Sequence, residues 1–594
     1  MTHPVILAAG LCRRMRPLSN ALHKTMIPLH DDWTILRGIL ESLSNCGFER
    51  ASIVTGYRAQ AVEEYALQHG AGLVIDFIHN PRFESTNNIH SLALAFEQVD
   101  VADGVLLIES DLVFEPGVLE RLLASPHPDV ALLDRYRPGM DGTVVQLAAD
   151  GHIERVIPSA QQGPDFAFEK HFKTLNLYRF SGDFCTGAFA RLLRFYSAEV
   201  SDNCFYELVL GMIVAAGQAR IYGEVLEDEG WAEVDDPVDL RQARYLVDRP
   251  GRRQLLRESW GGYWGLNVLD FAFIRNMYFP TPAVFAELRL QLPELIQNYG
   301  SSQAVLDQKM QWFLDFPGMD VATLNGASAA FPILRELWGD RPVLLPSPTF
   351  GEWERAFPEA QRYQDDGSGE LPDQLPTDSV LVVVNPNNPT GTIHATENIV
   401  GLARANPSSV VVVDESFVDF SDEKSALEMD PPPNVVVLKS LSKVLGVPGA
   451  RLGFLASADT ELVGLVRAQL PVWNTNSVAE KILELLLKNR GAIESSLAQT
   501  VKDREQLRVR LKSLEIVNRI WPSSADFLLV DLSLSADAAS EMADRLIADH
   551  GILVKDVSRR WGTGIGRIRI AVRTPADHEV LMQALQEQER YFSD

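Results

Sequence analysis

Short apolar runs alternate with amphipathic stretches along most of the chain. The runs PVILAAG, ASIVTGY and GVLLIES are each long enough for one buried strand, whereas ILRGILESLSNCG places its apolar residues at helical spacing. After a pause near residue 248, the alternation resumes with VLVVVNP, SVVVVDE and NVVVLKS. This pattern predicts an α/β fold, in which mostly parallel sheets are flanked by helices.

The pause in the pattern predicts a domain boundary. From Asp248 the chain reads DRPGRRQLLRESWGGYWG, a basic segment interrupted by Pro and Gly. A chain of 594 residues is also too long for a single hydrophobic core. We therefore predict a first domain over residues 1–247, a linker over 248–262 and a second domain over 263–594.

Composition and charge exclude several classes of partner. The net charge of −26 disfavours a nucleic-acid surface, which needs clustered Lys and Arg. The four cysteines include no C-x-x-C pair and predict reduced thiols in a cytoplasmic protein. No stretch approaches the roughly 18 to 20 apolar residues of a membrane span. The first apolar run is too short for a signal peptide and predicts a buried strand.

The stretch LAAGLCRRMRPLSNALHKTMIPL joins an apolar strand to a glycine-containing loop and several basic residues. Backbone N–H groups in such a loop can approach a triphosphate, and cations can neutralise the charge on the departing pyrophosphate. The loop alone is equally compatible with an ordinary strand-to-helix turn. Taken whole, LAAG-x(2)-R-x(2)-R-P-L-x(5)-K-x(3)-P resembles the signature of the sugar-nucleotide and cytidylyl transferase family. The resemblance implies a Rossmann-like nucleotidyltransferase domain, with Lys24 and Arg14 as catalytic residues and with nucleotide contacts at Leu7, Ala8, Ala9, Gly10, Arg14 and Lys24.

Two further segments resemble the phosphocholine and aminoalkylphosphonate cytidylyltransferase branch of that family. HNPRFESTNNIHSL, beginning at His79, implies that Asn87, Asn88 and Ser91 shape the nucleotide and acceptor pocket. Two asparagines and a serine can also cap a helix that begins near Asn88, and this alternative stays open. NCFYELVL makes Tyr206 and Glu207 candidates for holding an acceptor's ammonium group.

Acidic residues follow two predicted elements of the first domain. Asp111 ends the buried run VLLIESD, where an unpaired carboxylate is costly. The segment GWAEVDDPVDL offers Glu233, Asp235 and Asp236, which are equally compatible with an acidic helix start. Hard oxygen ligands suit Mg²⁺, and the resemblance places the metal ligands at Asp111 and Asp235, with Asp236 as the competing choice.

The second half contains a lysine in a setting typical of pyridoxal phosphate (PLP) enzymes. In LKSLSKVLGVPGARLGF, hydroxyl residues surround Lys443, and Arg451 follows eight residues later. These groups suit a lysine that carries the cofactor and an arginine that binds its phosphate. Lys439 is the competing lysine, but its distance from the arginine is greater. Together with NPNNPTG, VVDESFVDF and RIRIAVR, this segment resembles the fold-type I aminotransferase superfamily.

That resemblance implies a set of cofactor and substrate contacts. Asn388 would bond the cofactor's phenolic oxygen, Asp414 would pair with its pyridine nitrogen, and Arg569 would bind the substrate α-carboxylate. Phe350 is preferred over Trp353 for stacking on the ring, and Tyr299 would reach across a homodimer interface. The remaining implied contacts are Gly326, Ala327, Ser328, Ser440 and Ser442 for the cofactor and Asn276 for the substrate.

Within the superfamily, the second half is most similar to histidinol-phosphate aminotransferase and threonine-phosphate decarboxylase. Most transaminases have a tyrosine after D-E-S, whereas this chain has Phe417, as the decarboxylase does. The segment QLPVWNTNSVAE also favours the decarboxylase. The missing hydroxyl does not by itself decide whether CO₂ or a proton leaves.

The two halves together resemble the bifunctional cytidylyltransferase and PLP decarboxylase enzymes of phosphonate antibiotic biosynthesis. The resemblance implies CMP transfer from CTP to a small amino phosphonate or phosphate, with decarboxylation of the amino acid. The order of the steps, the acceptor and the choice of CTP over another nucleotide stay open. A transaminase in the second half is the alternative activity. A non-catalytic nucleotide sensor in the first half is disfavoured because Lys24, Asp111 and Asp235 occur together.

Overall fold

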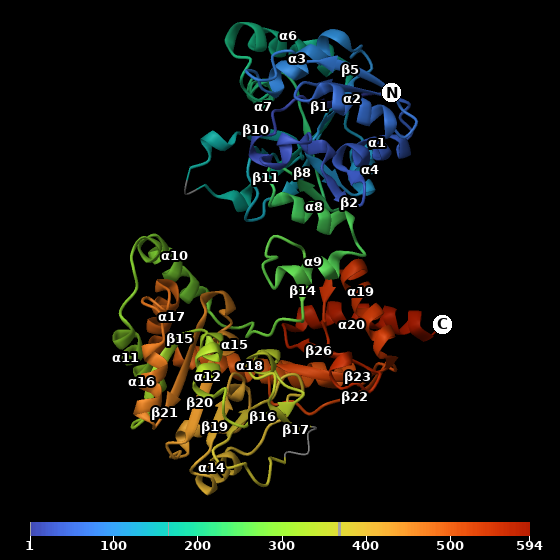
Figure 1. The fold of residues 1–594 in the computed structure, drawn as a ribbon. Coiled ribbons are helices and arrows are strands. Elements are labelled where there is room, and N and C mark those ends of the chain that lie inside the picture. Colours follow the sequence, from blue (N-terminus) through green and yellow to red (C-terminus); the bar gives the residue numbers. More distant parts are fainter. Residues whose placement is uncertain (1, 164–165, 366–369, 594) are drawn as a thin grey trace. The chain divides into compact units, whose positions relative to one another are not determined.

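The computed structural model describes residues 2–163, 166–365 and 370–593 and divides into two compact units. The units are Met1–Leu266 and Asn267–Asp594 (Figure 1). The segment predicted as a linker, 248–262, contains the helix α9 (Arg252–Ser259) and belongs to the first unit. Arg252, Arg253 and Leu256 of this helix are buried, so a segment that reads as basic and interrupted packs as part of the domain.

The first unit is built on a nine-stranded mixed sheet. Its strands are β10 (Ile153–Ile157), β9 (Val144–Leu147), β11 (Phe172–Phe180), β6 (Val105–Glu109), β1 (His3–Ala8), β4 (Arg50–Thr55) and β5 (Val74–His79) in spatial order, with β8 (Val130–Arg135) paired to β11 and β12 (Tyr222–Val225) to β8. The predicted runs form β1, β4 and β6, which are parallel neighbours. The sheet is less parallel than the sequence predicts, because β8 to β11 follow one another without an intervening α-helix and β11 pairs antiparallel on both sides.

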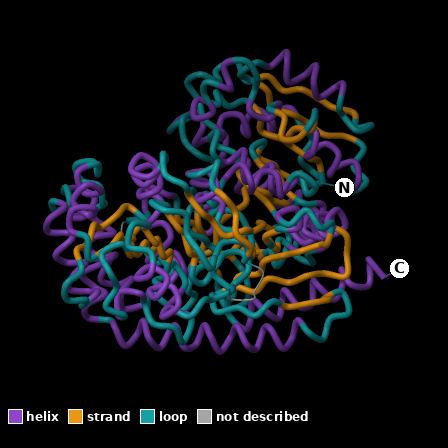
Figure 2. Tube along the Cα trace, turned by 60° about the horizontal axis from the view of Figure 1, so that its bottom comes forward, coloured by secondary structure: helices purple, strands orange, loops and turns teal. Residues whose placement is uncertain are grey.

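Helices and two small ribbons complete the first unit. The helices are α1 (Ile35–Asn45), α2 (Ala59–Gln68), α3 (Asn88–Gln98), α4 (Pro116–Ala124), α5 (Gly182–Phe184), α6 (Ala190–Phe195), α7 (Glu207–Ala215), α8 (Asp239–Val247) and α9. The ribbons are β2 (Pro28–His30) with β3 (Trp33–Thr34), and β7 (Leu112–Phe114) with β13 (Trp231–Glu233). Strands lie between helices in both units (Figure 2). Buried side chains form one cluster on each face of the large sheet, as expected for a sheet covered on both sides.

The second unit contains a seven-stranded sheet and a smaller antiparallel sheet. The large sheet has the order β15 (Asp320–Asn325), β21 (Leu452–Ser457), β20 (Val435–Ser440), β19 (Val410–Asp414), β18 (Val380–Val384), β16 (Val343–Ser347) and β17 (Gln361–Gln364). The runs of valine form β18, β19 and β20, which are parallel and buried. The small sheet is β22 (Val517–Ile520), β23 (Phe527–Ser535), β26 (Ile565–Ala571) and β25 (Lys555–Asp556), and β14 (Leu269–Asp270) pairs with β24 (Ile552–Leu553).

Eleven α-helices of the described part of the second unit surround these sheets. They are α10 (Pro282–Gln297), α11 (Gln303–Leu314), α12 (Ala330–Trp338), α13 (Gly351–Ala356), α14 (Thr396–Ala405), α15 (Leu441–Val444), α16 (Thr460–Ala468), α17 (Ser477–Lys488), α18 (Arg490–Leu511), α19 (Ala536–His550) and α20 (Pro575–Ser593). None of the helices in the described parts of either unit has the length and apolar content to span a membrane.

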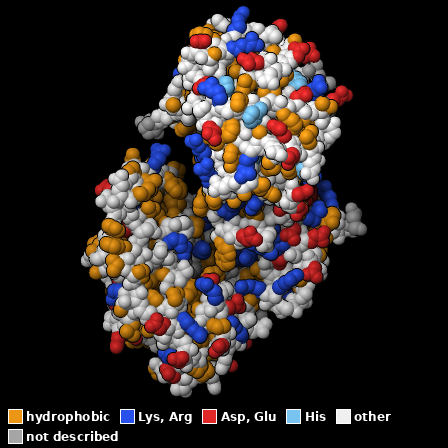
Figure 3. All heavy atoms as spheres, turned by 45° about the horizontal axis from the view of Figure 1, so that its top comes forward, with side chains coloured by type: hydrophobic (Ala, Val, Ile, Leu, Met, Phe, Trp, Pro, Cys, Tyr) orange, Lys and Arg blue, Asp and Glu red, His pale blue; other side chains and the backbone are white. Residues whose placement is uncertain are grey.

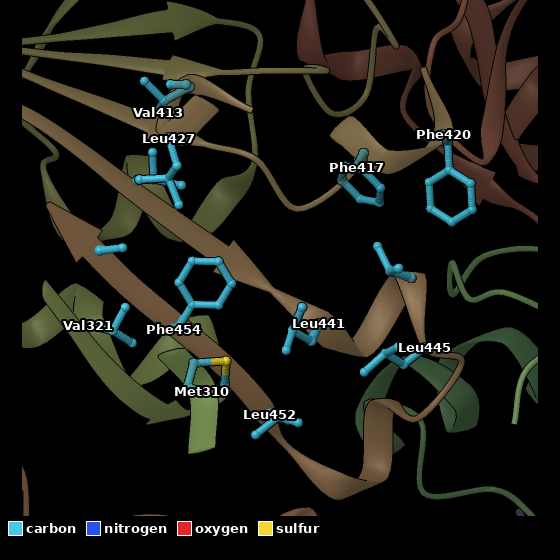
Figure 4. Close-up of a cluster of buried hydrophobic side chains, with 14 of the residues drawn as sticks. Met310, Val321, Val413, Phe417, Phe420, Leu427, Leu441, Leu445, Leu452 and Phe454 are labelled. Carbon is cyan, nitrogen blue, oxygen red and sulfur yellow. The ribbon is translucent and has the colours of Figure 1, made fainter. Parts of the chain in front are cut away.

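A buried cluster anchors the turn that carries Lys443. Leu441 and Leu445 flank this turn, and they pack in the same core as Phe417 and Phe454 (Figure 4). All four side chains are almost fully excluded from solvent. The turn at the end of β20 is therefore held by the core on both sides of the lysine.

The two cores predict separable effects on stability. Ile108→Ala in β6 removes a fully buried side chain from the first unit, and Phe454→Ala does the same in β21 of the second. Each change should destabilise its own unit by about 2–5 kcal/mol. Hydrogen-exchange mass spectrometry should show faster exchange in β1, β4 and β6 for the first variant and in β19–β21 for the second. Equal acceleration in both units by either variant would contradict this division.

Candidate active sites

A ribbon at the carboxyl end of β6 brings two distant aspartates together. Strand β7 begins just after Asp111 and pairs antiparallel with β13, which ends just before Asp235. The backbone N–H of Val234 donates to the Asp111 carbonyl at 2.8 Å. The two carboxylates, 124 positions apart in sequence, therefore face the same cation, Lys24.

Lys24 lies between these carboxylates. Its Nζ donates to Asp111 Oδ2 at 2.7 Å and to Asp235 Oδ1 at 3.4 Å. Burial opposes the charge on Lys24, but the two carboxylates outweigh it and raise the pKa of the ammonium. Arg14 donates to Asp235 Oδ2 at 2.7 Å from an exposed position. The site thus combines two protonated cations with two carboxylates.

The structure separates Asp235 from its neighbour Asp236. The Asp236 carboxylate accepts from the backbone N–H of Val238 at 2.6 Å, within the turn that leads into α8. Asp239 accepts the backbone N–H groups of both Asp235 and Asp236 at 2.8 and 2.9 Å. The helix-start interpretation therefore describes Asp236, whereas Asp235 faces Lys24.

The LAAG loop follows β1 and lies beside this cluster. Leu7, Ala8 and Ala9 have buried side chains, so only their backbone is available to a ligand. A side chain on Gly10 would meet no atom within 4 Å, which leaves the backbone open at that point. Open backbone N–H groups in a loop after a strand suit a phosphate.

The asparagine segment divides into structural and pocket-facing residues. Asn87 is the N-cap of α3, and its side chain accepts from the Asn88 backbone N–H at 2.9 Å. The Ser91 hydroxyl is buried and accepts from the Asn80 amide at 3.1 Å. Both are predicted nucleotide contacts; in the structure Asn87 has the capping role left open above, and Ser91 is bonded to Asn80. Asn88 differs, because its Nδ2 donates to Glu109 at 3.1 Å.

Glu109 and Glu207 form a buried acidic cluster with Tyr206. The Tyr206 Oη and Glu207 Oε2 atoms are buried and have no hydrogen-bond partner. Burial raises the pKa of Glu207, and burial together with the charges of Asp111 and Glu207 raises that of Glu109. Unpartnered buried oxygen atoms of this kind suit a cationic ligand such as an ammonium group. Glu109 was missed in the sequence because it reads as the last residue of an apolar strand.

Lys173 is a second residue that the sequence did not single out. It lies in β11, its side chain is only 2% exposed, and its Nζ lies 3.2 Å from a Glu233 carboxylate oxygen. Both side chains line a cavity of about 80 Å³ that also contacts Asp235. A charged residue in the apolar strand FKTLNLYRF was the available signal, because buried lysines are rare unless paired.

The carboxyl ends of β19 and β20 position the residues predicted to bind PLP. Asp414 ends β19, and its carboxylate accepts from the Trp353 indole at 2.9 Å and from the Ser416 hydroxyl at 2.6 Å. Burial raises the pKa of Asp414. Trp353 is therefore a buried partner of Asp414, which leaves Phe350, 39% exposed, as the ring available for stacking.

Lys443 lies in α15, directly after β20. Burial lowers the pKa of its ammonium group, with Asp526 opposing the shift and Arg569 adding to it. Lys439, the competing lysine, instead forms an ion pair with Asp419 at 2.8 Å. Of the flanking serines, Ser442 has a buried Oγ without a partner, and the Ser440 backbone N–H donates to Ser416 at 3.1 Å.

Asn276 supports the lysine turn. Its backbone N–H donates to the Lys443 carbonyl at 2.8 Å, and its Nδ2 donates to the Val444 carbonyl at 2.8 Å and to Ser496 Oγ at 2.7 Å. Its Oδ1 accepts from the Tyr278 backbone N–H at 2.9 Å. Asn276 was predicted to bind substrate, but its buried side chain is committed to the protein.

Gly326, Ser328 and Arg451 form a phosphate-sized cradle. Arg451 donates to Ser328 Oγ at 2.9 Å. Gly326 has φ 72° and ψ 155°, a conformation essentially limited to glycine, and a Cβ there would lie 2.4 Å from the Arg451 guanidinium. Ala327, which follows, opens a single turn of 3₁₀-helix with a buried side chain.

Arg569 of β26 meets Asn388, which lies in the turn after β18. Arg569 donates to Asn388 Oδ1 at 2.7 Å and to the Ala272 carbonyl, while its buried Nε has no partner. Burial lowers the pKa of Arg569 to about 10. Asp526, a strong electrostatic neighbour of both Arg569 and Lys443, was missed because nothing in SSADFLLV marks it as chemical.

Two aromatic residues complete the arrangement. Phe417 is buried and packs edge-on against Phe527, with ring centroids 5.4 Å apart. Tyr299 is 80% exposed and stacks on Trp473 at 4.2 Å. Tyr299 is therefore free to contact another chain.

The two sites fit their expected ligands to different extents. Within the described residues no group of three or more His, Cys, Asp and Glu side chains forms a ready metal site. Asp111 and Asp235 nevertheless converge, and the buried Asp111 Oδ1 has no partner, which fits a Mg²⁺ ion completed by phosphate oxygens and water. The glycine cradle, the Arg451–Ser328 pair and the buried Asp414 fit PLP.

Comparison with known proteins agrees with this division. Residues 279–585 match the family Aminotransferase class I and II, and residues 4–162 match the MobA-like NTP transferase domain. CMP-5'-(3-aminopropyl)phosphonate synthase of Streptomyces rubellomurinus is 34% identical, over 98% of this chain and 94% of that protein. The chain belongs to the same family. It is a nucleotidyltransferase joined to an enzyme of the fold-type I aminotransferase class. The fold of the second unit implies PLP as the cofactor.

Other relatives match about half of the chain. L-serine phosphate decarboxylase of Sulfurospirillum multivorans is 28% identical over 49% of this chain and 79% of that protein. The crystal structure of L-threonine-O-3-phosphate decarboxylase from Porphyromonas gingivalis covers 54% of this chain and 99% of that one, at 21% identity and a TM-score of 0.49. Histidinol-phosphate aminotransferase of Ruminiclostridium cellulolyticum is 28% identical over 50% of this chain and 86% of that protein.

The cradle predicts a defined cofactor-binding defect. Gly326→Ala should weaken PLP binding by about 10- to 100-fold, because the new Cβ displaces the Arg451 guanidinium and strains the backbone. Gly449→Ala is the matched control, since a Cβ there meets nothing within 4 Å and its φ is negative. Equilibrium dialysis of apoprotein with PLP measures both. Equal affinity for the two variants would contradict this role of Gly326.

Proposed function

We propose that the chain transfers CMP from CTP to a small amino phosphonate or amino phosphate and removes CO₂ from the amino acid through PLP. The full-length similarity to CMP-5'-(3-aminopropyl)phosphonate synthase carries this proposal, because it spans both sites at 34% identity. The charge arrangement in each unit supports it. Each unit then performs one of the two steps.

In the first unit, Lys24 and Arg14 would neutralise charge on the triphosphate. The raised pKa of Lys24 keeps it protonated at neutral pH, which suits a group that stabilises the departing pyrophosphate. Asp111 and Asp235 would hold Mg²⁺, whose positive charge would make the reacting phosphorus more electrophilic. Displacement of Lys24 from the carboxylates toward the phosphates would free both aspartates for the metal.

The acceptor would bind with its ammonium group toward the buried acidic cluster of Glu109, Tyr206 and Glu207. Glu207 and Tyr206 offer unpartnered oxygen atoms there, and Asn88 fixes the Glu109 carboxylate nearby. Lys173 is placed near Asp235, where its cation suits the acceptor's phosphonate. An acceptor with an amine at one end and a phosphonate at the other matches both charges.

In the second unit, PLP would withdraw electrons from the substrate's α-carbon when bound at Lys443. Arg569 would bind the α-carboxylate through its unpartnered Nε, and Asn388 orients the guanidinium by accepting from it. Asp414 would keep a proton on the pyridine nitrogen, in a position fixed by Trp353. Lys443 Nζ would carry protons to and from the reacting carbon.

Decarboxylation is preferred over transamination because of Phe417. Its ring packs on Phe527 in the core, so no hydroxyl reaches the cofactor from this position. Transamination is the second candidate, supported by the similarity to histidinol-phosphate aminotransferases. Only product analysis separates the two activities.

The test is to incubate the protein with CTP, Mg²⁺, PLP and L-amino acids that carry a terminal phosphonate or phosphate. Phosphorus NMR and mass spectrometry should show a product that gains CMP, loses CO₂ and retains its amine. A keto product, or a requirement for an added amino acceptor, would establish the transaminase instead. Asp111→Asn should reduce pyrophosphate release at least about 100-fold, whereas Asp103→Asn, an exposed carboxylate in the same unit, should not.

We also propose that the protein is a homodimer through the second unit. Among the described residues of α10, only Val284 is buried, and the helix exposes several large apolar side chains. Leu290 is 80% exposed and Ile296 71%, beside the exposed pair of Tyr299 and Trp473. Apolar side chains are visible on the surface of this unit (Figure 3). Exposed apolar side chains gathered on one helix suit a second copy of the chain.

The dimer predicts a change in mass on substitution of this helix. Leu290→Asp combined with Ile296→Asp should convert the dimer to a monomer, because charges on an apolar interface lose their water without gaining a partner. Sedimentation velocity at micromolar concentration measures the mass. Leu465→Asp, at an exposed leucine of α16, should leave the dimer intact. A monomeric wild type, or a double variant that remains dimeric, would refute the proposal.

A further inference from the structure

Asp526 is a fully buried carboxylate without a hydrogen-bond partner. It lies directly before β23, its side chain is 0% exposed, and neither Oδ1 nor Oδ2 accepts a hydrogen bond. Burying a charge in this way is costly unless other charges compensate for it. Asp531, five residues later on β23, shows the usual solution, because its carboxylate accepts from Arg567 and Trp521.

Arg569 lies over the ring of Phe527, the residue that follows Asp526, at 5.4 Å from the ring centroid. It is one of three cations, each from a different element, whose charge acts on the Asp526 carboxylate. They are Lys443 of α15, Arg569 of β26 and Arg504 of α18. Arg504 is committed elsewhere, since its guanidinium donates to the carbonyls of Phe420 and Ala525. Lys443 and Arg569 remain as the cations that Asp526 can serve.

The charge of Asp526 in turn acts on Lys443 and Arg569. Apart from burial itself, Asp526 is the strongest electrostatic influence on Lys443 and also on Arg569. The charges of Arg569, Arg451 and Asp414 also act on Lys443, and those of Arg560 and Asp270 act on Arg569. Two cations that repel each other therefore share the charge of one carboxylate.

We infer that Asp526 is a positioning residue of the PLP site, whose carboxylate is the counter-charge shared by Lys443 and Arg569. It keeps the Lys443 nitrogen and the carboxylate-binding guanidinium together despite their repulsion, and it raises the proton affinity of the nitrogen at position 443. This inference rests on the proposed role of Lys443 as the PLP lysine, but not on which substrate or reaction the second unit takes.

The protonation state of Asp526 should change when a substrate binds. Burial raises the pKa of its carboxyl to about 7, although Lys443 and Arg569 oppose the shift. A substrate α-carboxylate that docks on Arg569 would bring a second anion to the same cation. Asp526 would then take up a proton, since two carboxylates beside one cation do not both remain ionised.

The test uses the visible absorption of the holoenzyme, which changes when the nitrogen joining PLP to the lysine loses its proton. Lys443→Ala should first abolish the lysine-linked band, which establishes the assignment independently of any product. Asp526→Asn should then lower the pH midpoint of the band change by about one unit or more, because removal of the anion favours the unprotonated nitrogen. Asp531→Asn, which removes a carboxylate of the same strand that serves Arg567, should leave the midpoint within about 0.3 unit.

Near-ultraviolet circular dichroism confirms that each variant is folded, and Asp526→Ser replaces the asparagine variant if that one is not. A folded Asp526 variant with the wild-type midpoint would overturn the inference, and so would an equal shift in Asp531→Asn. If the wild-type protein with PLP shows no lysine-linked band, or if the Lys443→Ala variant still shows it, the assignment of Lys443 is refuted instead. Failure to form a CMP-linked product leaves this optical result unaffected and bears on the proposed function alone.

Discussion

Both sites depend on the compensation of buried charge at the carboxyl ends of parallel strands. Strands β1 and β6 end at the LAAG loop and at Asp111, and β19 and β20 end at Asp414 and at the Lys443 turn. At such an edge the backbone turns out of the sheet, and side chains can converge without breaking the ladder. Because these positions are largely shielded from water, each charge persists only beside a partner of opposite sign.

The two units solve this problem in different ways. In the first, Lys24 Nζ pairs directly with the Asp111 and Asp235 carboxylates at 2.7 and 3.4 Å, so the cation and the two anions compensate one another. A ligand must exchange these contacts for its own, and a triphosphate with a metal offers both signs of charge. In the second, Arg569 Nε and the Asp526 carboxylate oxygens have no hydrogen-bond partner. The unpartnered atoms leave the site open toward a cofactor and an amino acid.

The sequence predicted the fold and part of each site, for reasons that are local. Each run of valine occupies a single strand, and the signature around Lys24 lies within one continuous segment of the chain. The sequence did not single out Asp526, Glu109 or Lys173, because each interacts with residues that are distant in the sequence. Asp526, for example, interacts electrostatically with a lysine 83 positions earlier. Helix α9 was taken for a linker because its buried face is made by arginines, which read as surface residues.

Proximity also explains why residue type alone does not identify a ligand contact. Asn276 looks suitable for a substrate, but its amide is consumed by the Lys443 turn and by Ser496. Trp353 looks suitable for stacking, but its indole is consumed by Asp414. In both cases a polar side chain beside the catalytic residue serves the backbone or the carboxylate rather than the ligand. A buried hydrogen-bond donor must find an acceptor. Side chains near a site that pair with one another therefore have no donors or acceptors left for the substrate. The side chains that stay unpartnered are the ones that can bind it.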